Sequence, residues 1–295
     1  MRLGEFELNE PIPEFKAPHV LVVLRPWIDV GSVGTLSLSR LERHLRATEV
    51  GRLHRPGYFY DFTRYRPRSF FNEGQRAVSI PNTIIRHASR EHSNDLLLVH
   101  LLEPHLHGED FTESFIDLLR FVGAKRYSLV GAMYDTVPHT RPLLVSSSGV
   151  GGDVAAEQHL VRARVSNYEG PTTILSLIPQ EAIKMGLETR TYVAHLPQYF
   201  QVDEDFQGTA RIMEILCTLY NLPSRLIDFE RGREQYNTVQ NMVTSEGTNV
   251  SSFLQRLEER YDQEQRADTP PPPPLSSGIE DFLRDINEGF DAPER

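Results

Sequence analysis

Three short, continuously apolar segments limit what this chain can fold into more than any other feature of its sequence. They occupy residues 19–24, 96–102 and 127–133. A strand that is apolar at every position, rather than at every second one, is buried on both faces, as in a parallel sheet covered by helices. The chain is therefore predicted to be an α/β protein built around a mostly parallel sheet.

Segments of helical periodicity separate these apolar runs. Apolar residues recur near the helical period over residues 32–46, and Phe111, Phe115 and Leu118 recur at i, i+4 and i+7. Strands that alternate with helices through short connections are typical of a sheet with helices on its faces. The other elements that we expect are strands over residues 173–178 and 191–196 and helices over residues 180–185 and 205–220.

Residues 143–152 are rich in glycine and serine and have the composition of a phosphate-binding loop. They lack the order Gly-x-x-x-x-Gly-Lys-Ser/Thr, and no lysine follows them. We therefore predict a flexible turn at this position and expect no cofactor.

Polar side chains follow the third apolar run directly. Tyr134, Asp135, His139 and Arg141 share one loop, and two prolines stiffen its backbone. Loops at the carboxyl ends of strands line the crevice in which open α/β sheets bind ligands or partners. This loop is therefore the first candidate for a functional site.

The turn after the first apolar run offers two more polar residues, Asp29 and Ser32. They stand where the helix over residues 32–46 begins, and the free N–H groups of a helix N-terminus can hold an anion. The alternative is that Asp29 or Ser32 caps that helix.

Two interpretations of these polar groups are open. In an enzyme, His139 would serve as acid or base and Arg141 would clamp an anion. In a structural interpretation, Asp135 pairs with Arg141 and holds the loop shut. The chain contains no Gly-x-Ser-x-Gly elbow. The catalytic candidates of the first interpretation are Asp29, Ser32, Tyr134, Asp135, His139 and Arg141.

Three separated motifs carry a family resemblance: Trp-Ile-Asp-Val-Gly at 27–31, Asp-Phe-Thr-Arg-Tyr-Arg-Pro at 61–67 and Pro-His-Thr-Arg-Pro at 138–142. With these motifs, residues 1–262 resemble the bacterial branch of the proteasome assembly chaperone family, of the second-subunit type. The resemblance implies a three-layer α/β/α domain similar to the phosphorylase/hydrolase fold, self-association and no settled enzymatic activity. Some members of that family end in a hydrophobic-Tyr-any residue tail that inserts into the proteasome ring. This chain ends in Ala-Pro-Glu-Arg, so docking by that route is not predicted.

The net charge of −10 argues against binding to nucleic acids or to anionic membranes, because both require a basic face. No window reaches the roughly 18 apolar residues of a membrane span, and we expect a cytoplasmic protein. Cys217 is the only cysteine and cannot form an intrachain disulfide. His105 and His107 stand in a turn without a second ligand cluster, so no metal site is predicted.

Residues 50–78 are rich in aromatic residues and arginines. Both residue types are enriched in protein interfaces, and both also serve in binding to single-stranded nucleic acid. The acidic balance of the chain favours an interface, while packing on the chain's own domain with outward arginines stays open. The interface candidates are Tyr58, Tyr60, Phe62, Arg64 and Tyr65.

The C-terminal part of the chain changes character in steps. We expect an α/β/α core over residues 1–225, a helical arm over residues 226–265 on the core or on a neighbouring subunit, a proline-rich linker over residues 266–276 and an amphipathic helix over residues 277–291. The apolar stripe of that last helix would dock on a partner, on another subunit or on its own subunit. Its members are Ile279, Phe282, Leu283, Ile286 and Phe290.

These features favour a non-catalytic, homo-oligomeric assembly chaperone or scaffold protein, with a trimer or larger assembly preferred. The alternative is an enzyme of the phosphorylase/hydrolase type that acts on a nucleoside-like or other small anionic substrate.

Overall fold

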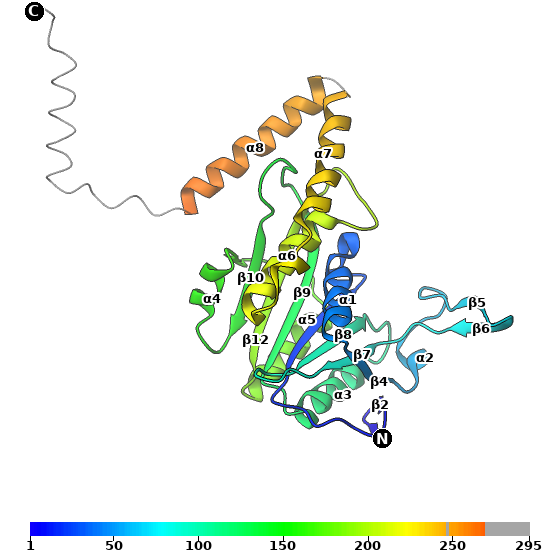
Figure 1. Ribbon diagram of the computed structural model, residues 1–295. Coiled ribbons are helices and arrows are strands. Elements are labelled where there is room, and N and C mark those ends of the chain that lie inside the picture. Colours follow the sequence, from blue (N-terminus) through cyan, green and yellow to red (C-terminus); the bar gives the residue numbers. More distant parts are fainter. Residues whose placement is uncertain (246–247, 269–295) are drawn as a thin grey trace, which may run out of the picture.

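The three apolar segments lie side by side at the centre of one sheet (Figure 1). Within residues 1–245 and 248–268, which are those that the computed structural model describes, this sheet has ten strands in the order β1-β2-β4-β7-β8-β3-β9-β12-β10-β11. Its strands are β1 (Arg2–Leu3), β2 (Phe6–Leu8), β3 (His19–Arg25), β4 (Thr48–Leu53), β7 (Ile84–Ala88), β8 (Leu96–Leu102), β9 (Arg126–Asp135), β10 (Val145–Val150), β11 (Arg164–Val165) and β12 (Glu188–Pro197).

The sheet is parallel in its middle, where β8, β3, β9 and β12 are neighbours. All seven residues of β8 are buried, as expected for a strand with helices on both faces. Antiparallel strands extend the sheet on both sides, with β7 next to β8 and β10 next to β12. The predicted parallel sheet is thus confirmed at its centre and becomes mixed toward its edges.

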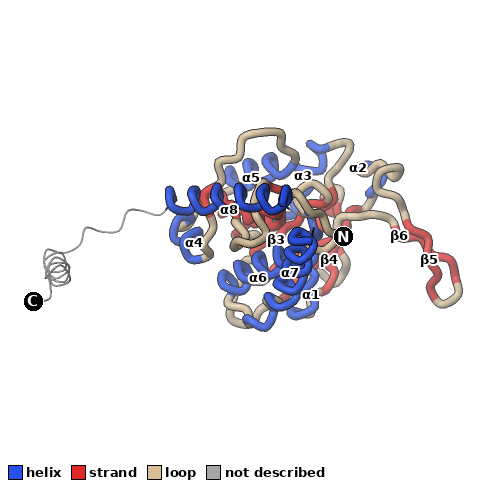
Figure 2. Tube along the Cα trace, turned by 90° about the horizontal axis from the view of Figure 1, so that it is seen from above, coloured by secondary structure: helices blue, strands red, loops and turns tan. Residues whose placement is uncertain are grey.

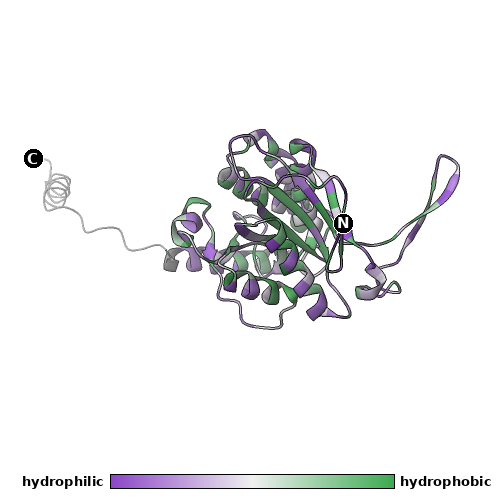
Figure 3. Ribbon diagram, turned by 90° about the horizontal axis from the view of Figure 1, so that it is seen from below, coloured by the Kyte–Doolittle hydropathy of each residue, from purple (hydrophilic) through white to green (hydrophobic). Residues whose placement is uncertain are grey.

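Helices cover both faces of the sheet, which gives the predicted three-layer α/β/α arrangement (Figures 2 and 3). One hydrophobic core lies between the sheet and helices α3 and α5, and a second lies between the sheet and helices α1 and α6. None of the described helices is long and apolar enough to cross a membrane. The helices are α1 (Val33–Leu45), α2 (Pro56–Phe59), α3 (Gly108–Phe121), α4 (Val154–Leu160), α5 (Ile174–Lys184), α6 (Phe206–Tyr220), α7 (Phe229–Ser245) and α8 (Thr248–Asp268).

Two sequence predictions for single elements were wrong. A strand was predicted over residues 173–178, but helix α5 begins at Ile174, because Ile174, Ile178 and Ala182 recur every fourth residue and are all buried. The predicted flexible turn at 143–152 contains strand β10. There Val145 and Ser147 alternate as buried residues, and the strand pairs along its whole length with β12.

Two parts of the chain project from the layered body (Figures 1 and 2). The first is a hairpin of β5 (Arg68–Asn72) and β6 (Gln75–Ser79), which pair only with each other. The second is the helical pair α7 and α8, in which α8 turns back toward the sheet from the far end of α7. Its apolar residues Leu254, Leu257 and Tyr261 are buried.

The turn after β3 approaches β9 closely, and glycine makes this possible. The amide of Ala132 donates to the carbonyl oxygen of Ile28 over 2.9 Å, and a Cβ at Gly131 would lie 2.1 Å from that oxygen. A side chain at position 131 must therefore push the turn away from the sheet.

We expect Gly131→Ala to lower the free energy of unfolding by about 1–3 kcal/mol, because the added methyl group overlaps backbone that cannot rotate away. Urea denaturation measures the change. Gly108→Ala is the matched control, since nothing lies within 4 Å of a Cβ at that position. Equal stability of the two variants would contradict this account of the turn.

Candidate functional site

The polar turns after β3 and β9 lie at the same edge of the sheet. Asp29 forms an isolated parallel bridge with Ala132, and Tyr134 and Asp135 are the last two residues of β9. We call this edge, formed by the carboxyl ends of β3, β9 and β12 and the loops that follow them, the rim. The structure therefore brings together the two turns in which sequence analysis placed the candidate residues.

Asp29 caps helix α1 at the rim. Its carboxylate accepts hydrogen bonds from the backbone N–H of Thr35 over 3.0 Å and from the Thr35 hydroxyl over 2.6 Å. Burial raises the pKa of Asp29, and these hydrogen bonds oppose the rise. The Ser32 hydroxyl donates to the carbonyl of Asp203 over 2.8 Å. Both side chains are thus engaged within the chain.

Asp135 binds a histidine from the neighbouring strand. Its Oδ2 lies 2.7 Å from Nδ1 of His195 in β12, and this hydrogen bond is the main reason that the pKa of Asp135 is lowered. The Nε2 atom of His195 is buried and has no hydrogen-bond partner among the described residues. Sequence analysis missed His195, although its place near the end of a predicted strand, in register with β9, was the available signal.

His139 is enclosed by aromatic rings. Its Nδ1 lies 2.5 Å from the hydroxyl of Tyr199, which also accepts a hydrogen bond from the His139 backbone N–H over 2.7 Å. The rings of Phe200 and Tyr236 pack against the imidazole edge to face. Burial lowers the pKa of His139, so its neutral form predominates near pH 7.

The same aromatic cluster reaches the turn after β3 through Asp205. The hydroxyl of Tyr236 donates to the carboxylate of Asp205 over 3.0 Å, and Asp205 caps helix α6 by accepting from the Gly208 N–H. The backbone N–H of Asp205 in turn donates to the carbonyl of Gly31 over 2.8 Å. Helix α7, which carries Tyr236, is therefore fastened to both polar turns.

Helix α8 lies over the loop that follows β9. Arg141 makes a two-pronged ion pair with Asp262, with both N···O distances 2.9 Å, and Glu258 lies 3.4 Å away. The Tyr261 hydroxyl donates to the carbonyl of Pro142 over 2.8 Å, and Thr140 bonds Glu258. The loop is held shut as the structural interpretation expected, but by α8 and not by an Asp135–Arg141 pair.

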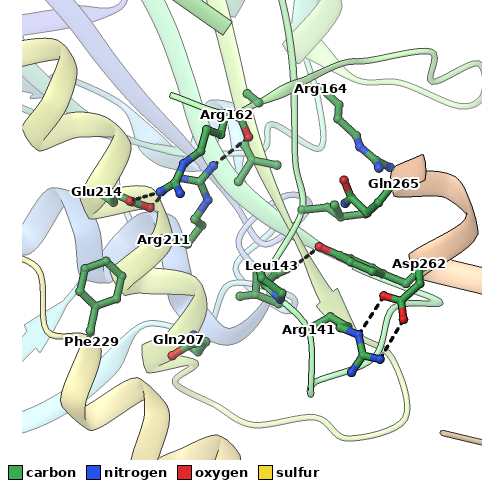
Figure 4. Close-up of a pocket in the computed structure, with 15 residues that line it drawn as sticks. Arg141, Leu143, Arg162, Arg164, Gln207, Arg211, Glu214, Phe229, Asp262 and Gln265 are labelled. Atoms are coloured by element: carbon green, nitrogen blue, oxygen red, sulfur yellow. Dashed lines mark hydrogen bonds and ion pairs between the residues drawn. The ribbon is translucent and has the colours of Figure 1, made fainter. Parts of the chain in front are cut away.

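A cavity of about 690 Å³ lies where α8, α6 and β10 meet (Figure 4). Four arginines line it, and each of them has a carboxylate near it: Arg141 has Asp262, Arg162 and Arg211 share Glu214, and Arg164 lies 4.0 Å from Glu264. The positive charge of the cavity is thus largely neutralised by the chain itself.

The five interface candidates occupy different environments. Tyr60 is only 2% exposed and bonds Thr83, so it belongs to the core and not to a surface. Tyr58 stacks on His107 with ring centroids 3.8 Å apart, and the Tyr65 hydroxyl donates to the carbonyl of Glu103. Phe62 lies over Gly57, and the Arg64 side chain is 73% exposed.

The five residues predicted to dock a partner, Ile279, Phe282, Leu283, Ile286 and Phe290, lie outside the described residues. Within residues 1–245 and 248–268, no group of three His, Cys, Asp or Glu side chains is placed to hold a metal ion.

Because the pKa of His139 is lowered in the folded chain, the free energy of unfolding should depend on pH through this residue. The unfolded chain binds a proton at His139 below about pH 6.5, whereas the folded chain does not until the pH falls further. The contribution of His139 to stability is therefore present above about pH 6.5 and is lost as the pH falls.

We expect His139→Gln to reduce the decline in the free energy of unfolding between about pH 7.5 and 5.5 in urea titrations. His92, whose side chain is 93% exposed, supplies the control variant His92→Gln, which should decline like the original protein. A decline of unchanged steepness in His139→Gln would show that His139 does not carry this effect.

Comparison with known proteins agrees with this fold. Residues 23–242 match the PAC2 family. A protein of unknown function from Corynebacterium glutamicum superposes with a TM-score of 0.76 at 21% identity, over 90% of this chain and 99% of that chain.

Two further solved structures that resemble this chain carry a role in their names. A proteasome-assembly chaperone homologue from Mycobacterium tuberculosis has a TM-score of 0.69 at 20% identity, over 80% of this chain and 99% of that chain. The archaeal proteasome activator PbaB from Pyrococcus furiosus has a TM-score of 0.62 at 13% identity, over 82% of this chain and 98% of that chain. No curated protein matches the chain significantly. The family match spans most of the chain and confirms the resemblance found in the sequence, so this protein belongs to the PAC2 family.

Proposed function

We propose that this protein is a non-catalytic, homo-oligomeric assembly chaperone or scaffold that binds partner proteins in the cytoplasm. The observation that carries the proposal is that the polar side chains of the turns after β3 and β9 are largely engaged by the chain itself. Asp29, Ser32 and Arg141 each bind groups of their own chain, and α8 lies across the loop where a substrate would enter. Polar groups of this kind hold the helices and loops to the edge of the sheet.

The comparisons support the same function. One similar structure is a proteasome-assembly chaperone homologue, and another is an archaeal proteasome activator. Both names refer to action on another protein assembly. We extend that mode of action to this chain, with the apolar stripe of residues 277–291 as a docking element joined to the body by a proline-rich linker.

We expect the purified full-length chain to elute in size-exclusion chromatography with light scattering at three or more times the 33.7 kDa mass of one chain. The measurement should be made at micromolar concentration and repeated after tenfold dilution. A single monomeric species in both runs would contradict the proposed self-association.

One observation favours the alternative of an enzyme. The Asp135–His195 pair lines a cavity of about 730 Å³, together with Ser146 and Arg260. A carboxylate that orients an imidazole through Nδ1 is part of the arrangement of a general base, and the buried Nε2 would have to be uncovered to reach a substrate. The second candidate is thus a hydrolase or phosphorylase of small anionic substrates, centred on His195 and not on His139.

This second candidate predicts that a nucleoside with inorganic phosphate raises the melting temperature by about 5 °C or more at a hundredfold excess over the dissociation constant. The shift should disappear in His195→Gln and persist in His92→Gln, because His92 is almost fully exposed. The absence of any shift across a panel of nucleosides and small anions would remove this candidate.

A further inference from the structure

The β5–β6 hairpin has no partner within the described chain. It forms its own two-stranded sheet, and its turn at Glu73 and Gly74 has positive φ at both positions, as a tight two-residue hairpin requires. No residue of either strand is buried. Isolated two-stranded hairpins are marginally stable in water, so this one gains stability when another surface covers it.

The hairpin offers apolar side chains and open edges together. Phe71 is 72% exposed and Val78 is 59% exposed, and the register of the strands puts both on the same face with Arg76. Phe70, on the opposite face, is 47% exposed. Each strand also has one edge with unpaired backbone groups, which another segment can use.

The hairpin is basic on an acidic protein. Residues 65–80 hold Arg66, Arg68, Arg76 and Glu73, three positive charges against one negative charge. None of the three arginines makes an ion pair with another described residue, and Arg76 instead lies 5.9 Å from the ring centre of Phe71. The surface that fits this hairpin is therefore both apolar and acidic.

The chain itself contains a segment of that chemistry. Residues 277–291 hold five carboxylates and one arginine, a net charge of −4, in addition to the five apolar residues of the predicted stripe. In composition, the aromatic residues and arginines of the hairpin thus match the phenylalanines and carboxylates of the segment. The acidic balance of the segment is the complement of the basic balance of the hairpin.

The segment cannot reach the hairpin of its own subunit by a direct path. The end of α8 and the hairpin lie on opposite sides of the body (Figures 1 and 2). Residues 269–276 span at most about 28 Å when fully extended. A globular body of this length has a radius of gyration of roughly 18 Å and hence a diameter of roughly 46 Å.

We propose that residues 277–291 of one copy dock on the β5–β6 hairpin of a second copy. The inference rests on the self-association in the proposed function and assigns its contact. Because hairpin and segment are different surfaces, the contact is head-to-tail, and such contacts generate rings when the rotation closes. Two copies can close the contact by reciprocal exchange, and larger rings form when the rotation per subunit is smaller than a half turn.

Charge reversal in the full-length chain tests the contact. We expect the hairpin variant Arg66→Glu/Arg68→Glu/Arg76→Glu and the segment variant Asp281→Lys/Asp285→Lys/Glu288→Lys each to raise the dissociation constant of the oligomer about a hundredfold or more, measured by analytical ultracentrifugation. A chain that carries both sets of changes restores opposite charges and should re-form the oligomer.

The control variant is Arg43→Glu/Arg225→Glu/Arg233→Glu, which reverses three exposed arginines away from the hairpin and should leave the oligomer intact. An oligomer that resists both reversals, or one that the control dissociates equally, overturns the head-to-tail contact while self-association stands. A monomeric original protein overturns the proposed function as well.

Disulfide formation between two differently tagged chains, with oxidised glutathione supplied as the oxidant, identifies the contact directly. A chain with Val78→Cys and a chain with Ile286→Cys should cross-link when they are mixed, whereas the single native cysteine, Cys217, is buried. Val165→Cys, on β11 and 74% exposed against 59% for Val78, replaces Val78→Cys as the control. A cross-link at position 165 but not at position 78 would overturn the proposal.

Discussion

The four parallel strands at the centre of the sheet are the constraint on which the rest of the structure depends. With every residue of β8 and the five central residues of β3 buried, neither face of this unit can meet water, and helices must cover both. Parallel strands also need crossover connections, so the turns that follow β3 and β9 meet at one edge. The concentration of polar groups at the rim is a result of this topology.

At the rim, the chain uses its own polar groups to join its layers. Asp29 and Asp205 cap helices, Tyr199 and Tyr236 enclose His139, and Arg141 fastens α8. A buried polar group is tolerated only when it is hydrogen-bonded, and here most partners come from elements distant in the sequence. Among the described rim residues, the Nε2 atoms of His139 and His195 are buried without a hydrogen-bond partner, and His195 is the one that a carboxylate orients through Nδ1.

The elements that could be predicted from the sequence are those whose type follows from the spacing of nearby apolar residues. Continuous apolar runs identified β3, β8 and β9, and apolar residues that recur at the helical period identified α1, α3 and α6. Prediction failed where contacts between distant segments determine the element. Residues 145–150 form a strand because they pair with β12. The apolar residues of α5 fit the period of a strand as well as that of a helix. The rim was located correctly, but partners such as His195 and Asp262 lie 60 or more positions away and follow only from register and from the path of α8.

Helix α8 is held on the body by side-chain contacts on one side and continues into the rest of the chain at its C-terminal end. On one side, it covers the rim through ion pairs that water partly screens and through three buried side chains. At its C-terminal end, helix α8 stops at Asp268. A pull on the chain beyond this point acts on α8 before it acts on the strands, which are held by full ladders of hydrogen bonds. Helix α8 is therefore the part that yields first under load, and the sheet beneath it keeps its form.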